Sequence, residues 1–364
     1  MRLMNLHHII AGLSLPAILA TTLSAQQPGG RSAAPGWERR PEEGRGVPLP
    51  VGAKAFHDLS YVTNGHPRQR LDLYLPDQPG KPPLIIIIHG GAFRSGDKGQ
   101  TTGLQFLRAG YAVASLNYRL SGDAIFPAAV QDCKAAVRWL RANAAKYHLD
   151  PDHFGAWGSS AGGNLVAMLG TTGNTKEFEV GENLSTSSRV QAVADFFGPT
   201  DFLQMDSHRL PNGMVHDDAQ SPESLYIGGP IQEKKDQVAK SNPITFITGD
   251  TPPFFIAHGD MDPLVPHHQS VLLEVALKKA GVPVQFHTVK GAGHGFHDAV
   301  IDEKLMNFFE HHLKPAGTGA RWPGGNAKRP LKPGENELTR MSKLFRNVPI
   351  RTQVIMSPFT GLVV

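Results

Sequence analysis

The chain has 364 residues, a formal net charge of +4 and a single cysteine, Cys133. Residues 316–364 contain eight Lys or Arg and two Glu, which is +6, and Arg2 adds +1, so about −3 remains for the rest. The positive net charge therefore comes from the C-terminal tail, and the charge of the remaining chain gives no reason to expect a nucleic-acid-binding core. One thiol excludes an internal disulfide, so cysteine usage says little about the compartment.

Residues 1–25 have the order of a secretory signal peptide. Arg2 is followed by an apolar run and then by small residues that end at Ala25. The apolar run contains Pro16 and is short for a membrane span, so we expect export across a bacterial-type inner membrane and a secreted or periplasmic protein. An uncleaved membrane anchor is the alternative interpretation.

Two further segments are expected to lie outside the folded domain. Residues 26–53 are rich in Pro, Gly, Arg and Glu and have no apolar period, which predicts a flexible linker. Residues 316–364 are predicted to be a basic, disordered tail. The stretch between them, residues 54–315, has a length that suits one large α/β domain with a sizeable core.

The first elements of this domain are predicted to be two strands, at residues 55–62 and 69–75. Leu71, Leu73 and Leu75 alternate with other residues in the period of an antiparallel strand with one exposed face. The next strand, residues 84–88, is apolar at every position, which fits a parallel strand buried on both faces.

Strands and helices then alternate. Further strands are predicted at residues 111–116, 153–157, 190–197, 253–258 and 284–289, and helices at 104–109, after Pro127, and at 164–169, 271–280 and 300–313. In the helix after Pro127, an apolar stripe is expected to face the core, and four charged residues are expected on the wetter side: Asp132, Lys134, Arg138 and Arg141.

This alternation predicts the α/β class. We expect a mainly parallel central sheet with helices on both faces and an antiparallel edge formed by the opening strands. Residues 198–252 lose the periodicity, with apolar residues scattered among Gly, Pro and Asp. They are predicted to form an irregular, cap-like excursion from the carboxyl end of a strand, where such a segment is well placed to cover a site.

The most informative motif is the G-x-S-x-G pattern of Gly158 to Gly162, with Ser160 at its centre. It follows a predicted strand and precedes a predicted helix, so a tight turn would expose the Ser160 hydroxyl. Glycines on both sides allow the backbone to crowd where a Cβ would clash. An ordinary helix N-cap is the alternative role for this serine.

A serine nucleophile needs a general base and a group that orients the base. His294 lies in a glycine-flanked loop after the strand at 284–289, and Asp262 follows the strand at 253–258. Both therefore lie at carboxyl ends of predicted strands, where Ser160 is also expected. Asp260 and Asp201 are rival candidates for the acid.

A tetrahedral intermediate also needs N–H donors for its developing oxyanion. The run from His89 to Phe93 follows the strand at 84–88, and its glycines let backbone amides approach a substrate. We assign the N–H groups of Gly91, Ala92 and Ala161 as the candidate donors. His89 is expected to shape this loop rather than to act as a base.

Taken together, these motifs resemble the α/β-hydrolase superfamily, and the resemblance spans about residues 54–314. Within it, the chain is similar to the branch of hormone-sensitive-lipase-like esterases and secreted feruloyl and acetyl xylan esterases. The resemblance implies that the aspartate directly before Pro-Leu is the triad acid, which favours Asp262 over Asp260. Ala92 departs from the third glycine that lipase-like relatives often have.

The sequence therefore predicts a serine carboxylic-ester hydrolase that works through an acyl-enzyme on small acyl or aromatic esters. The resemblance implies carbohydrate-linked esters, such as acetyl or feruloyl groups on polysaccharide, as one substrate class. A serine peptidase of the same fold and a non-catalytic binding protein on a hydrolase scaffold are the alternatives.

No cofactor, metal or nucleic acid is expected to take part in the reaction. The glycine spacing of Gly91 to Gly96 is that of a P-loop, but Asp97 stands where the phosphate-binding lysine belongs. The chain contains no H-E-x-x-H motif and, with one cysteine, no C-x-x-C pair. The sequence leaves the oligomeric state open, and after signal cleavage no membrane span is expected.

Overall fold

The computed structural model describes residues 49–100 and 103–314. The predicted leader, most of the predicted linker and the predicted tail lie outside these residues. Among the residues described, no helix combines the length and apolarity that crossing a membrane requires.

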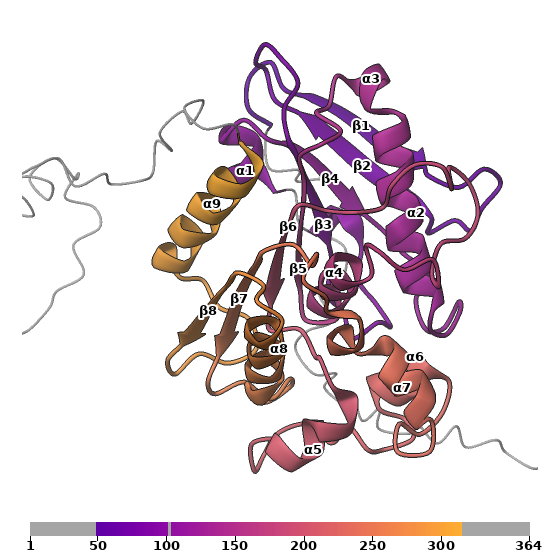
Figure 1. Ribbon diagram of the computed structural model, residues 1–364, viewed down its shortest axis with the longest axis vertical. Coiled ribbons are helices and arrows are strands. Elements are labelled where there is room, and N and C mark those ends of the chain that lie inside the picture. Colours follow the sequence, from indigo (N-terminus) through magenta and orange to yellow (C-terminus); the bar gives the residue numbers. More distant parts are fainter. Residues whose placement is uncertain (1–48, 101–102, 315–364) are drawn as a thin grey trace, which may run out of the picture. The chain divides into compact units, whose positions relative to one another are not determined.

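The centre of the fold is an eight-stranded sheet with the order β1-β2-β4-β3-β5-β6-β7-β8 (Figure 1). Its strands are β1 Lys54–Ser60, β2 Arg70–Leu75, β3 Leu84–Ile88, β4 Ala112–Leu116, β5 Phe154–Ser159, β6 Ala192–Phe196, β7 Phe254–Gly259 and β8 Val284–Val289. β1 and β2 pair antiparallel, β2 pairs antiparallel with β4, and every later pairing is parallel. The predicted parallel sheet with an antiparallel edge is therefore confirmed.

The expectation of one exposed face on β2 is wrong, because the four residues from Leu71 to Tyr74 are all buried and Asp72 pairs with Lys98 at 2.8 Å. The burial of β3 follows its pattern. All five residues of β3 are buried, because β3 lies between β4 and β5 with helices on both faces. β1, at the edge, has no fully buried residue and contains an irregularity in its pairing between Phe56 and Leu59. An exposed edge strand with a bulge resists pairing with other chains.

Helices cover both faces of the sheet (Figure 1). Apart from short 3-10 turns they are α1 Leu104–Arg108, α2 Ala128–Ala142, α3 Ala144–Tyr147, α4 Ala161–Thr171, α5 Met205–His208, α6 Pro222–Ile227, α7 Lys235–Ser241, α8 His268–Lys279 and α9 Ala299–Leu313. α1 and α9 pack with one side of the strands in one apolar cluster, and α2, α4 and α8 pack with the other side in a second. The core is therefore two apolar layers that the sheet separates.

One expectation about α2 is wrong. Asp132, Lys134 and Arg138 are not on a wet face, because each is at most 1% exposed. Asp132 pairs with Arg119 at 2.7 Å, and Lys134 and Arg138 both pair with Glu179. The periodicity of one helix does not reveal these partners, since they lie on other segments that cover the charged side of α2. Arg141 is half-buried and donates to the carbonyl of Pro151 at 2.8 Å.

Residues 198–252 follow the carboxyl end of β6 and precede β7. They hold the short helices α5, α6 and α7 (Figure 1). Several of their apolar side chains are buried in the same cluster as α4: Phe202, Met205, Tyr226, Ile227, Ile231 and Val238. The excursion is thus irregular in backbone but packed against the core.

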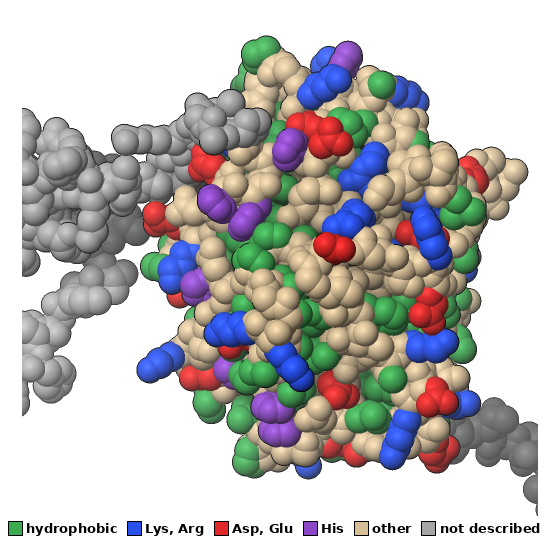
Figure 2. All heavy atoms as spheres, in the orientation of Figure 1, with side chains coloured by type: hydrophobic (Ala, Val, Ile, Leu, Met, Phe, Trp, Pro, Cys, Tyr) green, Lys and Arg blue, Asp and Glu red, His purple; other side chains and the backbone are tan. Residues whose placement is uncertain are grey.

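On the face of the molecule shown in Figure 2, Lys and Arg side chains are interspersed with Asp and Glu. This mixture agrees with the small negative balance that the sequence leaves outside its termini. The face in view therefore presents no single-sign patch.

Candidate active site

Ser160 lies where β5 ends and α4 begins, and its backbone is strained. Its φ is 56° and its ψ is −125°, a conformation that costs a non-glycine residue of order 1–3 kcal/mol. An ideal Cβ at Gly158 would lie 2.3 Å from the carbonyl oxygen of Gly162, and one at Gly162 would lie 2.1 Å from that of Ile88. Both flanking positions exclude a side chain, which confirms the steric reason for the two glycines.

The Ser160 side chain does not cap the helix that follows it. It makes no capping hydrogen bond to α4, and its Oγ lies instead 2.9 Å from Nε2 of His294. His294 lies in the loop between β8 and α9, 134 residues further along the chain. The fold therefore brings together the predicted serine and histidine at hydrogen-bond distance.

Asp262 completes the hydrogen-bonded chain. Its Oδ2 lies 2.8 Å from Nδ1 of His294, while its Oδ1 accepts the N–H groups of Leu264 at 2.8 Å and Val265 at 2.9 Å. Burial alone raises the pKa of Asp262, but hydrogen bonds from His258 and His294 outweigh burial and hold this pKa below its usual range. The carboxylate is therefore ionised and fixes Nδ1 as the protonated nitrogen of His294.

The two rival acids have other contacts. Asp260 accepts the N–H of Gly291 at 2.6 Å, and Asp201 accepts the N–H of Leu203 at 3.1 Å as the cap of a 3-10 turn. Neither carboxylate makes a hydrogen bond to His294 in the part of the chain that the structure describes. Among the three candidate acids, only Asp262 is bonded to the histidine.

A second histidine, which sequence reasoning did not assign, also contacts the acid. His258 is the penultimate residue of β7 and is fully buried. Its Nε2 lies 3.2 Å from Asp262 Oδ2 and 3.0 Å from the Val265 carbonyl. Both partners are acceptors, so Nε2 carries the proton and Nδ1 accepts from the Ser270 hydroxyl at 2.7 Å. The signal was available, since His258 stands four residues before Asp262 in the same motif.

Aromatic rings surround the histidine. The Phe197 ring meets His294 edge to face at 4.8 Å, and Phe296 packs against both Phe197 and Phe196. Phe197 itself has a φ of 44°. These rings exclude water from one side of the imidazole, which strengthens its polar contacts.

The loop between β3 and α1 passes directly beside Ser160. An ideal Cβ at Gly90 would lie 2.8 Å from the Ser159 carbonyl oxygen and 3.2 Å from the Cβ of Ser160. The backbone of this loop reaches the turn at Ser160 only because Gly90 has no side chain.

The three predicted oxyanion donors are N–H groups that remain unpaired. Within residues 49–100 and 103–314, the N–H groups of Gly91 and Ala92 have no acceptor. Ala161 is the first residue of α4, so its N–H has no acceptor inside the helix. All three groups are thus available to an oxygen atom of a bound ligand.

His89 is held as a structural member of the loop. It is 4% exposed, and burial lowers its pKa to about 4, so the ring is neutral at neutral pH. Nδ1 lies 2.7 Å from the Gly90 carbonyl, to which it donates, and Nε2 accepts from Arg68 at 3.3 Å. The ring stacks on Tyr118 at 4.5 Å. These contacts agree with a role in shaping the loop.

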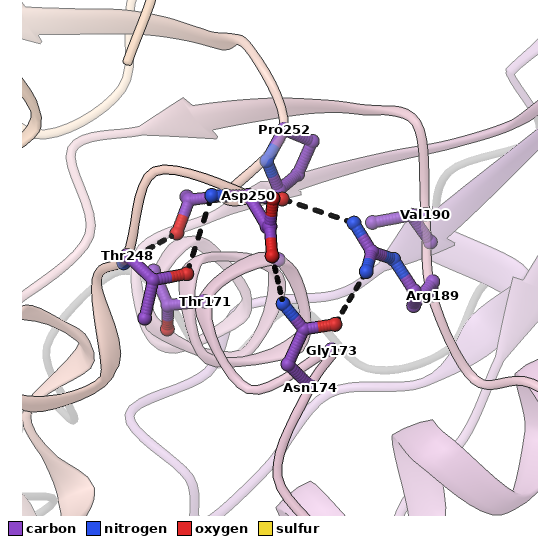
Figure 3. Close-up of a pocket in the computed structure, with 10 residues that line it drawn as sticks. Thr171, Gly173, Asn174, Arg189, Val190, Thr248, Asp250 and Pro252 are labelled. Atoms are coloured by element: carbon purple, nitrogen blue, oxygen red, sulfur yellow. Dashed lines mark hydrogen bonds between the residues drawn. The ribbon is translucent and has the colours of Figure 1, made fainter. Parts of the chain in front are cut away.

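A polar depression elsewhere on the surface is distinct from this site. Figure 3 shows Arg189, Asn174 and Asp250 bonded to one another at its centre, with Thr171 and Pro252 beside them. Its lining includes the last residues of α4 and the segments just before β6 and β7. It therefore lies near the amino ends of these two strands, whereas Ser160 and Asp262 follow the carboxyl ends of β5 and β7. The described residues contain no group of three His, Cys, Asp or Glu placed to hold a metal ion.

Comparisons with known proteins find similarity to a family model and to esterases. The family model BD-FAE matches residues 71–277. A probable carboxylic ester hydrolase of Mycobacterium tuberculosis, LipM, is 31% identical over 276 residues, which are 71% of this chain and 62% of LipM. The chain spans 56–62% of the length of LipM and the two further curated relatives that follow it in similarity.

Among solved structures, the chain is similar to carbohydrate esterases. A truncated carbohydrate esterase from the gut microbiota is 38% identical, with a TM-score of 0.67 over 72% of this chain and 97% of that one. A bifunctional GH43-CE protein of Bacteroides eggerthii is 37% identical, with a TM-score of 0.65 over 71% of this chain and 38% of that one.

Proposed function

Because the chain belongs to the BD-FAE family of α/β-hydrolase-fold carboxylic ester hydrolases, we propose that it is a serine esterase with Ser160 as nucleophile. The observation that carries the proposal is the hydrogen-bonded chain from Ser160 through His294 to Asp262, with distances of 2.9 and 2.8 Å. Ser160 sits on a strained turn beside unpaired N–H groups. This combination matches the needs of acyl transfer.

In the proposed reaction, Ser160 Oγ attacks the acyl carbon of the ester while His294 Nε2 takes the hydroxyl proton. The carbonyl oxygen gains negative charge in the tetrahedral intermediate, and the N–H groups of Gly91, Ala92 and Ala161 donate to it. His294 then gives its proton to the leaving alcohol, and an acyl-enzyme remains. Water, activated by His294, releases the acid and restores the serine.

Asp262 keeps the imidazole in the tautomer that the first step requires. Its ionised carboxylate accepts Nδ1–H, so Nε2 is free to receive the serine proton. The same carboxylate stabilises the imidazolium that forms after proton transfer. Replacing it with Asn inverts this preference, because the amide offers an N–H group in place of an acceptor.

For the substrate, we propose a small acyl or aromatic ester attached to a carbohydrate. The support is the similarity to two carbohydrate esterase structures at 37–38% identity. Acetylated xylan, methyl ferulate and short p-nitrophenyl esters would separate acetyl, feruloyl and simple carboxylic ester preferences. An exported location, supported by the signal-like residues 1–25, would be tested by the N-terminus of the mature protein.

The test of the mechanism compares the wild type with Ser160→Ala. Hydrolysis of p-nitrophenyl acetate should fall by about 10⁴-fold or more in the variant. A fluorophosphonate probe should label the wild type on Ser160 and leave the folded variant unlabelled. Full activity in the variant would overturn the proposal, and a matched amide hydrolysed faster than the ester would favour a peptidase.

A further inference from the structure

The excursion after β6 supplies aromatic contacts to the loop that carries two proposed oxyanion donors. Phe93 ends the run from His89, and its ring stacks on Tyr226 with 3.9 Å between centroids and 10° between planes. Phe202 meets both rings edge to face at 6.3 Å. Tyr226 belongs to α6 and Phe202 to a 3-10 turn, so both come from residues 198–252.

These contacts hold a backbone that would otherwise relax. Ala92 and Phe93 have φ values of 55° and 58°, and two successive non-glycine residues in this region persist only where their surroundings over-determine them. Phe93 is 1% exposed, and its carbonyl accepts the N–H of Ser121 at 2.8 Å. The fixed ring and the fixed carbonyl together prevent the peptide groups of the loop from turning.

Tyr226 acts on the loop through its ring and not through its hydroxyl. It is 1% exposed, and its hydroxyl has no hydrogen-bond partner among the described residues. Its backbone carbonyl accepts the N–H of Phe126 at 2.7 Å, which fixes the position of α6 beside the loop. A phenylalanine at position 226 would keep the stacked ring and remove a buried polar atom that lacks a partner.

We propose that Tyr226 is a positioning residue for residues 89–93, which we call the oxyanion loop because they include the proposed donors Gly91 and Ala92. By stacking on Phe93, it keeps the N–H groups of Gly91 and Ala92 aimed at the carbonyl oxygen of the substrate, and Phe202 supports the same ring pair. The excursion thereby contributes to the rate of the chemical step. This inference rests on the proposed esterase function and extends it to a segment that makes no contact with Ser160, His294 or Asp262 among the hydrogen bonds described.

The test uses Tyr226→Leu and Tyr226→Phe, with Phe178→Leu as the matched control. Phe178 is also 1% exposed and packs edge to face against Phe126 and Phe246, but its ring has no aromatic contact with Phe93. Thermal unfolding should show comparable stability losses for the two leucine variants. Ester hydrolysis and the rate of fluorophosphonate labelling then separate positioning from general destabilisation.

Tyr226→Leu should lower kcat about ten- to hundredfold, because small misplacement of a donor costs this much, while KM changes by less than about threefold. Labelling by the fluorophosphonate should slow in parallel, since its phosphoryl oxygen needs the same donors. Tyr226→Phe should keep kcat within about twofold of the wild type, as should Phe178→Leu.

Equal kcat values in Tyr226→Leu and Phe178→Leu would overturn the inference, as would a change confined to KM. The wild type and Ser160→Ala are measured in the same assay. An active wild type with an inactive Ser160→Ala upholds the proposed function whatever Tyr226→Leu does, whereas a wild type that hydrolyses no ester would overturn both proposals.

Discussion

His258 Nε2 lies 3.2 Å from the same oxygen of Asp262 that faces His294 Nδ1 at 2.8 Å. The acid therefore receives donors from two imidazoles on one oxygen and from two backbone N–H groups on the other. Charge that is shared among four donors is less available to any one of them. His258 thus limits how strongly Asp262 stabilises an imidazolium at His294.

Replacing His258 by Phe should reduce the stability of the protein most at neutral pH. The hydrogen bond from His258 is the first of the contacts that hold the pKa of Asp262 below its usual range, so without it this pKa should rise toward that range. A depressed carboxyl pKa adds stability above the pKa of the unfolded chain, about 4, and this stability is lost as the pH falls. The measurement is denaturant unfolding of the variants at pH 7 and pH 3.

His258→Gln is the control, because its side-chain amide retains an N–H donor for Asp262. Both variants lack the imidazole, so we expect His258→Phe to be less stable than His258→Gln at pH 7 and the difference to shrink at pH 3. A purely steric role for His258 predicts the same difference at both pH values, and that pattern would contradict the argument.

The two glycines that flank the turn at Ser160 are required by different close contacts, and the contacts at Gly162 are the tighter ones. Gly162→Ala places a Cβ 2.1 Å from the Ile88 carbonyl oxygen and 2.7 Å from that of His89. These are backbone atoms of β3 and the oxyanion loop, which cannot move without disturbing both. The variant should lose about 3 kcal/mol or more of unfolding free energy.

Gly122→Ala is the matched control for this substitution. A Cβ at Gly122 would meet nothing within 4 Å, so the change should stay within about 0.5 kcal/mol. Chemical denaturation of both variants measures the difference. A Gly162→Ala protein as stable as Gly122→Ala would show that the strand, the turn and the loop are less tightly packed than their contacts indicate.

Much of this fold and site could be predicted because the determining patterns are local. The unbroken apolar run of Leu84–Ile88 predicts a buried strand without knowledge of its neighbours, and the structure has the same bounds. Ser160, Asp262 and His294 each lie just after a strand, β5, β7 and β8 respectively. In a parallel sheet, the carboxyl ends of strands meet at one edge, so their proximity follows from the topology.

What sequence reasoning missed depends on contacts between distant segments. In the sequence, the spacing of Lys134 and Arg138 indicates the solvent-exposed side of a helix. In the structure, both side chains pair with Glu179, which lies on another segment. Tyr226 lies in a segment without hydrophobic periodicity, so no sequence pattern predicts that its ring stacks on Phe93. Where an irregular segment sets the positions of side chains, the contacts of those side chains cannot be predicted from a single sequence.

The strained backbone at Ser160 should cost the protein unfolding free energy, which is the cost of holding the serine hydroxyl in this position. Glycine adopts a φ of 56° without a steric cost, whereas alanine does not. Ser160→Gly should therefore be about 1 kcal/mol more stable than Ser160→Ala, although both lack the nucleophile. Thermal unfolding of the two inactive proteins measures the strain directly, and equal stabilities would show that the turn is relaxed.

Asp195 gives the fold a pH dependence that is separate from the chemistry. It lies in β6 and is fully buried, its Oδ1 accepts the N–H of Gly198 at 2.9 Å, and its Oδ2 has no partner among the described residues. Burial raises the pKa of Asp195 to about 7, although the hydrogen bond from Gly198 opposes the shift. The folded protein therefore binds this proton more tightly than the unfolded chain does.

Stability should consequently fall as the pH rises from about 4, where the carboxyl of the unfolded chain begins to ionise, to about 7, where the folded one does. Above pH 7 the loss is complete, on the order of a few kcal/mol. Asp195→Asn keeps an oxygen for the Gly198 N–H and cannot ionise, so it should be more stable than the wild type at pH 8 and nearly equal to it at pH 4.5. Denaturant unfolding of both proteins at the two pH values measures this difference. A stability difference that is the same at both would mean that the Asp195 carboxyl does not change its ionisation on folding.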